Sequence, residues 1–128
     1  MRKQILVIDD DKAVRKSFLL AFEDVDYAVD TAESGEKGIE KVQDTKVDLI
    51  FLDLKMPGID GVETLRRIRK LDSDMPIYIV TAFHKAFLDK LGAAAEDGLN
   101  FEIISKPIGA DKINLLARSV LEKPLEVQ

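Results

Sequence analysis

The stretch VDLIFLDLKMPGIDG, residues 47–61, decides the fold of this chain of 128 residues. It is apolar with little polar alternation up to residue 52, stops at Asp53 and then turns through Met56-Pro57-Gly58. Such a run predicts a strand that is buried on both faces, as in a parallel sheet covered by helices. A carboxylate at the end of a buried strand is costly unless water, a partner or a metal receives it. Taken alone, however, Asp53 could simply begin a loop.

Three further apolar runs end in polar residues in the same way. They are residues 5–8 before Asp9-Asp10-Asp11, residues 76–80 before Thr81, and residues 101–104 before Ser105-Lys106-Pro107. In a parallel sheet the carboxyl ends of the strands share one edge, which is where open α/β sheets bind ligands. We therefore expect acids, a hydroxyl and a lysine to meet there in one polar site.

The segments between these runs have the 3.6-residue apolar period of helices. We expect a short strand at residues 27–32 and helices at residues 12–24, from Ser34-Gly35, from Asp60-Gly61, at residues 85–96 and at residues 110–122. Five βα units with right-handed crossovers predict a three-layer, doubly wound α/β domain. The first helix needs only one aspartate as its N-cap, so three consecutive, mutually repelling acids indicate a cation.

Composition indicates one ordinary domain, expected at residues 1–122, with residues 123–128 as a tail or linker stub. The chain is 46% hydrophobic and 34% charged, and no apolar run approaches the roughly 20 residues that span a bilayer. We expect a cytoplasmic protein that does not associate with membranes. The absence of cysteine excludes disulfides and thiolate metal sites, and a net charge of -5 argues against a nucleic-acid surface. The basic residues Arg66, Arg67, Arg69 and Lys70 are interpreted as a solvated helix end.

Taken together, these motifs resemble the receiver domain of two-component response regulators over nearly the whole chain. They are Asp9-Asp10, Asp53 with Met56-Pro57-Gly58 and Asp60-Gly61, Thr81-Ala82, and Lys106-Pro107. The resemblance implies a flavodoxin-like sheet with strand order 2-1-3-4-5 and a phosphoacceptor function rather than that of an enzyme. The implied partners are a sensor histidine kinase or phosphotransfer protein, and an output domain or partner protein controlled through the face of helix 4, strand 5 and helix 5.

The resemblance also implies a role for each residue of the site. Asp53 would accept the phosphoryl group, while Asp10, Asp53 and the backbone carbonyl of Lys55 would bind Mg²⁺, with Asp9 acting through a water molecule. Lys106 and the Thr81 hydroxyl would contact the phosphoryl oxygens, and the Lys106-Pro107 bond would be cis. Neutralising the charge of two approaching anions is the physical need that these groups meet.

Two departures from the family pattern concern the switch. The family usually carries an aromatic residue three positions before the lysine, where this chain has Ile103, and residues 98–100 include an apparent extra residue. By the period of two, Phe101 lies on the same side of the strand as Ile103 and is a candidate substitute for the aromatic. The positions that flank the approach of hydrolytic water in the family are Lys55 and Phe83 here, which predicts a long-lived phosphoryl group.

Three alternatives remain. A flavodoxin-type nucleotide binder would need a phosphate-binding first loop, but Asp9-Asp10-Asp11 would repel a phosphate. A phosphatase with an aspartyl nucleophile would normally carry a second acid two residues on, where this chain has Lys55. A degenerate receiver that acts as a phosphorylation-independent interaction module ranks second, because every residue of the acceptor site is present.

Overall fold

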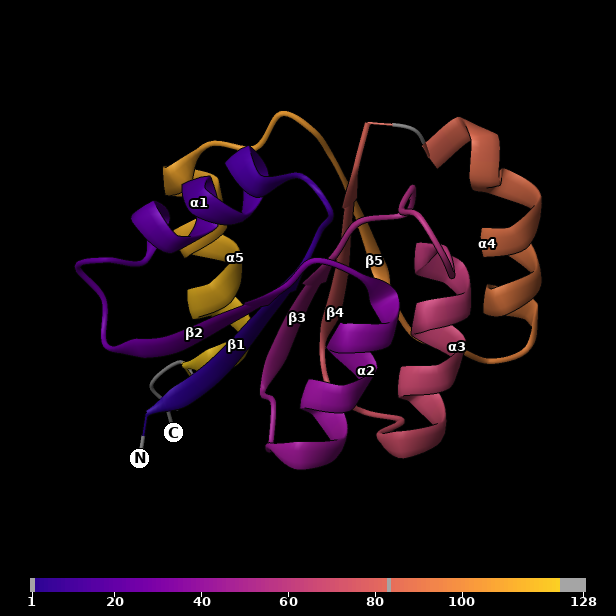
Figure 1. Ribbon diagram of the computed structural model, residues 1–128, viewed down its shortest axis with the longest axis horizontal. Helices are drawn as coiled ribbons and strands as arrows, with labels where there is room; N and C mark the ends of the chain where they lie inside the picture. The colour runs from indigo at the N-terminus through magenta and orange to yellow at the C-terminus, as the bar shows by residue number, and fades with distance from the viewer. Residues whose placement is uncertain (1, 83, 123–128) are drawn as a thin grey trace, which may run out of the picture.

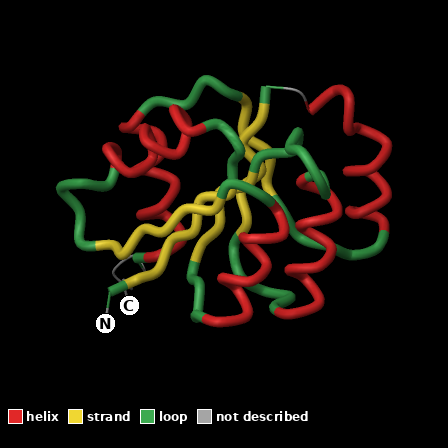
Figure 2. Tube along the Cα trace, viewed as in Figure 1, coloured by secondary structure: helices red, strands yellow, loops and turns green. Residues whose placement is uncertain are grey.

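Five parallel strands form a single sheet in the order β2-β1-β3-β4-β5 in the computed structural model, which describes residues 2–82 and 84–122 (Figures 1 and 2). Along the chain the elements are β1 (Lys3–Ile8), α1 (Lys12–Ala21), β2 (Tyr27–Ala32), α2 (Gly35–Asp44), β3 (Leu49–Leu52), α3 (Gly61–Leu71), β4 (Ile77–Thr81), the 3-10 helix η1 (His84–Phe87), α4 (Leu88–Glu96), β5 (Glu102–Ser105) and α5 (Ala110–Leu121). The predicted flavodoxin-like topology is confirmed.

The helices cover the sheet from both sides. Figure 1 shows α1 and α5 on one face and α2, α3 and α4 on the other. Each face carries its own core cluster, since successive residues of a strand point to opposite faces. On β1, Leu6 and Ile8 belong to the cluster under α2, α3 and α4, whereas Ile5 and Val7 belong to the cluster under α1 and α5.

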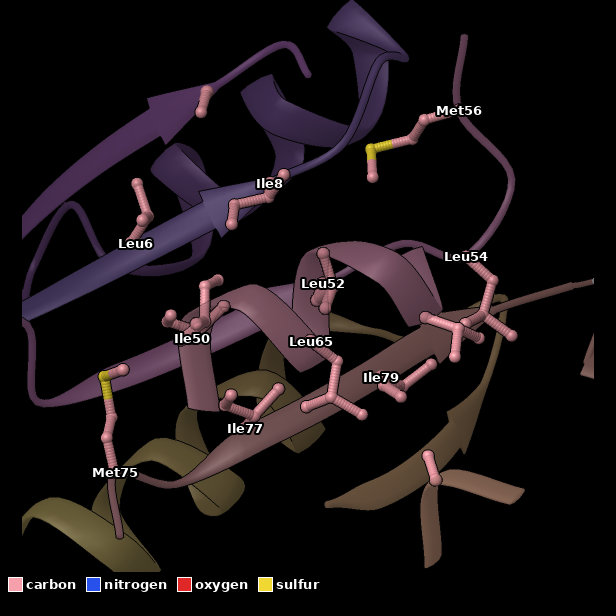
Figure 3. Packing of buried hydrophobic residues seen from close by; sticks show 14 of the residues in the cluster. Leu6, Ile8, Ile50, Leu52, Leu54, Met56, Leu65, Met75, Ile77 and Ile79 are labelled. Atoms are coloured by element: carbon pink, nitrogen blue, oxygen red, sulfur yellow. The ribbon is translucent and has the colours of Figure 1, made fainter. Parts of the chain in front are cut away.

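The cluster under α2, α3 and α4 is shown in Figure 3, where Leu65 of α3 lies over the strand side chains Ile50, Leu52 and Ile79. These four side chains are at most 1% exposed. β3 and β4 are buried along their whole length, and β1 is buried from Ile5 to Ile8, so these strands are covered on both faces as the apolar runs predict.

The first helix was expected to extend to residue 24, but it ends earlier, so the expected end of this helix is wrong. α1 stops at Ala21, and the Phe22 N–H bonds back to the carbonyls of Phe18 and Leu20. Phe22 is 3% exposed and packs edge-on against Tyr27, with ring centroids 5.9 Å apart. Burial of Phe22 between the helix and β2 requires the chain to turn back at this point.

The fourth helix also differs from its predicted form. The expected helix at residues 85–96 is divided into η1 and α4, and the N-cap of α4, Phe87, makes no side-chain capping bond. The starts of α2 and α3 are as predicted, because Ser34 and Asp60 accept hydrogen bonds from the amides of Lys37 and Glu63.

Arg69 is not part of a solvated helix end. It is 7% exposed, and its guanidinium donates to the backbone carbonyls of Asn100 and Asp72. The loop before β5 supplies the Asn100 carbonyl and the end of α3 supplies the Asp72 carbonyl, so the interpretation of a solvated cluster is wrong for Arg69. None of the helices within residues 2–82 and 84–122 is both long enough and apolar enough to cross a membrane.

Candidate functional site

The carboxyl ends of β1 and β3 place two acids side by side. Asp9 follows β1 and Asp53 follows β3, and the Asp53 N–H donates to the Ile8 carbonyl across the sheet at 2.9 Å. Both residues are buried, with 3% of Asp9 and 6% of Asp53 exposed. The sheet register therefore holds two carboxylates in a position where water solvates them poorly.

Asp10 completes a cluster of three carboxylates. One carboxylate oxygen from each of Asp9, Asp10 and Asp53 lies within 4.8 Å of the others, and Asp10 is the exposed member. Asp11 has a different task, because it is the N-cap of α1 and accepts from the Ala13 N–H at 2.9 Å. The three consecutive acids thus divide between the cluster and the helix cap.

Lys106 is the lysine that bonds to the two buried acids. It follows β5, and its N–H donates to the Thr81 carbonyl at 3.1 Å. Its Nζ lies 2.9 Å from an oxygen of Asp9 and 3.4 Å from an oxygen of Asp53. The Lys106-Pro107 bond is cis, as the resemblance implies. One lysine thus bridges the two buried acids.

These groups line an open pocket of about 530 Å³ at the carboxyl edge of the sheet. Its remaining lining comes from Asp11, Lys55, Met56 and Pro57. The predicted convergence of acids and a lysine on one edge is confirmed by this arrangement. Thr81 ends β4 and is fully buried, whereas Phe83, expected to flank the approach of water, lies outside the described residues.

Burial shapes the ionisation of the pair. Burial and the nearby charge of Asp9 raise the pKa of Asp53 to about 6, although Lys106 and the backbone oppose this rise. For Lys106, burial by itself lowers the pKa, but hydrogen bonds and charge from Asp9 and Asp53 outweigh burial and raise it. Lys106 therefore stays charged while facing two carboxylates.

The donor set fits a hard divalent cation. All three carboxylates supply oxygen, which Mg²⁺ prefers. The pocket is lined by four acids and two lysines, so the lysines do not balance the negative charge. One carboxylate oxygen of Asp9 accepts a hydrogen bond from the Asp11 N–H, and the other accepts from Lys106. Asp10 and Asp53 are therefore better placed as direct ligands of a cation.

Two contacts that support the site were not predicted from the sequence, although Gly61 itself belongs to the Asp60-Gly61 motif. Gly61 starts α3, its N–H donates to the Leu54 carbonyl at 2.8 Å, and a Cβ added at Gly61 would overlap the Asp53 carbonyl oxygen. Arg15 donates from Nη1 to the Asp9 carbonyl at 2.8 Å. The available signals were the glycine after Asp60 and a basic residue one helical turn after Asp11.

Phe101 does not lie near the pocket. It precedes β5, packs against the core under α3 and α4, and lines a separate cleft with Arg69, Pro76 and Asn100 at the amino edge of the sheet. Ile103 itself is 40% exposed on β5. The candidate substitute for the missing aromatic is thus at the opposite edge from Asp53.

A doubly wound parallel sheet in the order β2-β1-β3-β4-β5, with an acidic pocket at its carboxyl edge, places the protein in the flavodoxin-like class of α/β folds. The family model described as the response regulator receiver domain matches residues 5–118 of the sequence, and the chain belongs to this family.

Curated relatives include transcriptional regulators. The transcriptional regulatory protein GlrR of Escherichia coli (strain K12) is 34% identical over 119 residues, which cover 93% of this chain and 26% of that protein. The transcriptional regulatory protein AfsQ1 of Streptomyces coelicolor is 35% identical, with 93% of this chain and 51% of that protein covered. The chain therefore spans about a quarter to a half of the length of these relatives.

Solved structures show the same fold. The response regulator receiver domain protein of Methanospirillum hungatei JF-1 is 28% identical with a TM-score of 0.82, over 95% of this chain and 96% of that chain. The response regulator protein TrrA of Thermotoga maritima, solved in complex with Mg(2+)-BeF, is 32% identical with a TM-score of 0.77, over 92% and 98% of the two chains.

Proposed function

We propose that this receiver accepts a phosphoryl group on Asp53 from a phosphohistidine of a sensor histidine kinase or a phosphotransfer protein. The observation that carries the proposal is the meeting of three carboxylates within 4.8 Å at the carboxyl edge of the sheet, with Lys106 bonded to two of them. Membership of the response regulator receiver family supports the proposal.

The chemistry is a displacement at phosphorus. An oxygen of ionised Asp53 forms a bond to phosphorus, the bond from phosphorus to the histidine nitrogen breaks, and the electron pair returns to the imidazole. With its pKa raised to about 6, Asp53 is mostly ionised near pH 7, so no general base is needed. What the reaction requires is neutralisation of charge, which Lys106 supplies beside Asp53 and the Thr81 hydroxyl supplements by a hydrogen bond.

Asp10, Asp53 and the Lys55 backbone carbonyl would hold Mg²⁺, with Asp9 acting through a water molecule. The bound ion would supply positive charge between the carboxylate and the phosphoryl oxygens. Support comes from the oxygen-only cluster and from the Mg(2+)-BeF complex of the Thermotoga relative.

The remaining parts of the proposal concern the domain and its partners. Residues 1–122 form the receiver, and residues 123–128, which lie outside the described residues, form a tail or linker. The output is a partner or an attached domain, as the greater length of the regulators GlrR and AfsQ1 suggests. Phosphorylation controls it through the face formed by α4, β5 and α5, in the cytoplasm and without direct nucleic-acid binding by the receiver.

Incubation with acetyl phosphate and Mg²⁺, followed by intact mass measurement, tests the function. The parent should gain one phosphoryl group and release acetate, whereas Asp53→Asn should gain none. Asp11→Asn is the matched control, because asparagine keeps the helix cap and the variant should still form the adduct.

Two results would contradict this proposal. Persistent labelling of Asp53→Asn would place the acceptor elsewhere. A folded parent that gains no adduct with any phosphodonor would favour the degenerate interaction module.

Asp10→Asn should weaken Mg²⁺ binding, measured by titration of backbone amide resonances.

A further inference from the structure

We propose that Arg15 is a positioning residue for the metal site, because it fixes the backbone that presents Asp10. The inference rests on the proposed Mg²⁺ site and adds a residue on α1 that does not itself contact the ion. Arg15 Nη1 donates to the backbone carbonyl of Asp9 at 2.8 Å, in a partly buried position.

That carbonyl belongs to the peptide that joins Asp9 to Asp10, so its direction sets the backbone on the amino side of Asp10. The peptide on the other side is also held, since the Asp11 N–H donates to Asp9 Oδ1 at 2.9 Å. Asp10 has an exposed side chain, but the peptides on both sides of it are held by hydrogen bonds. Its carboxylate can therefore project toward Asp53 from a fixed backbone.

The anchor on α1 is itself well fixed. The Arg15 N–H bonds to the Asp11 carbonyl at 3.1 Å, and Asp11 caps the same helix. Residues 9–15 thus form a closed set of contacts in which the start of α1 and the acidic loop hold each other. Groups that orient a metal ligand from outside the coordination sphere commonly contribute 10- to 100-fold to metal affinity.

The charge of Arg15 and its hydrogen bond to Asp9 should have opposite effects on the affinity for Mg²⁺, so the direction of the change in affinity tests this role. A cation beside the acids repels Mg²⁺, so removal of its charge alone should strengthen metal binding. Loss of the bond to Asp9 should weaken binding, because the Asp10 backbone is then free to reorient. A weaker variant can therefore not be explained by charge.

The experiment is a Mg²⁺ titration of the parent and its variants, followed by backbone amide resonances at a temperature where all are folded. Arg15→Met keeps the apolar stem but removes the donor and the charge, and its Kd for Mg²⁺ should rise about tenfold. Arg15→Lys keeps a donor and the charge and should recover part of this loss. Lys12→Met removes an exposed charge close to the acids and should bind Mg²⁺ as tightly as the parent or more tightly.

The inference is wrong if Arg15→Met binds Mg²⁺ within twofold of the parent, or if Arg15→Lys binds no better than Arg15→Met. Dispersed amide spectra without metal separate a local effect from unfolding. The adduct experiment separates this inference from the proposed function, because the parent would still be phosphorylated on Asp53 if Arg15 had no role.

Discussion

The negative charge of Asp53 is unfavourable in the folded protein because of its surroundings. Asp53 is buried and close to Asp9, and its pKa rises to about 6 although Lys106 lies 3.4 Å away. In the metal-free protein, the folded state therefore binds the Asp53 proton more tightly than the unfolded chain does. Ionised Asp53 therefore lowers the stability of the folded protein when no cation is bound beside it.

The pH dependence of stability tests this property of Asp53. Because the folded-state pKa lies above the ordinary value of 3.8, ionisation of Asp53 lowers the free energy of unfolding as the pH rises from about 4 to about 6. In EDTA at pH 7, Asp53→Asn should therefore be more stable than the parent, by at most roughly 3 kcal/mol for a shift of about two units. At pH 4 the difference should largely vanish. Urea unfolding at both values measures it, and an equal difference at the two values would contradict the account.

We expect the lifetime of the phosphoryl group on Asp53 to depend on Lys55 and Phe83. Lys55 lines the pocket and carries a long cationic side chain beside the approach to Asp53. We expect Lys55→Asn to speed loss of the mass adduct, because an amide orients water where the lysine side chain obstructs it. Phe83→Ala should act in the same direction, and unchanged decay in both variants would disprove the shielding. A tenfold change corresponds to about 1.4 kcal/mol in the barrier.

Among the elements, the junction of β3 and α3 holds the acceptor in place. Gly61 starts α3 directly against the Asp53 carbonyl, and Asp60 both caps α3 and pairs with Lys90 of α4 at 2.8 Å. The loop from Asp53 to α3 thus has no room for a side chain at its end. Two substitutions at this junction separate sterics from capping.

Gly61→Ala should destabilise the protein by about 1 to 3 kcal/mol or more, because the new methyl group meets backbone atoms that cannot move aside. Gly92→Ala is the control in the exposed interior of α4, where nothing lies within 4 Å of an added Cβ. That change should stabilise by roughly 0.5 to 1 kcal/mol. Chemical unfolding measures both, and a neutral Gly61→Ala would show that the junction is looser than described.

Asp60→Ala should cost about 1 kcal/mol through loss of the helix cap. Asp60→Asn keeps an acceptor for the Glu63 N–H and loses only the ion pair with Lys90, whose side chain is 61% exposed. Since such exposed pairs contribute about 0.2 to 1 kcal/mol, the asparagine variant should retain most of the stability. Equal losses in urea unfolding would instead make the ion pair the main contribution.

At the scale of the whole molecule, β5 connects the pocket to the proposed output face, which is formed by α4, β5 and α5. Lys106 bonds to Asp9 and Asp53 at one end of the sheet, and its backbone continues from β5, which carries Ile103. Ile103 is partly exposed, and Phe101 lies at the other edge, so no aromatic side chain on β5 adjoins the site. If phosphorylation acts on the face formed by α4, β5 and α5, as we propose, we expect the relay to depend on backbone movement of the segments that follow Thr81 and Ser105.

We therefore expect Ile103→Ala to leave phosphorylation intact and to reduce the conformational response only modestly. Amide resonances of α4, β5 and α5, recorded with Mg²⁺ before and after acetyl phosphate, measure this response. The parent should show changes that extend into α4. If changes are confined to the metal site while α4 is silent, the output face lies elsewhere.

The sequence by itself determined the class of fold and the membership of the site. Buried strands and amphipathic helices have local periods that can be read without a structure, and the order of polar residues after each run predicted that Asp9, Asp10, Asp53 and Lys106 meet at one edge. These features depend on local pattern and on the geometry common to all parallel sheets.

Only the tertiary structure decided how neighbouring residues of one type differ. Asp53 is buried and Asp10 exposed, although both are acids that follow a strand, and Arg69 is buried beneath Asn100 while its basic neighbours on α3 remain on the surface or pair with acids there. The end of α1, the bond from Arg15 to the Asp9 carbonyl and the contact of Gly61 with Asp53 were likewise not apparent from the sequence. Each depends on where a distant segment packs, and burial and hydrogen bonding are properties of that packing rather than of the local pattern.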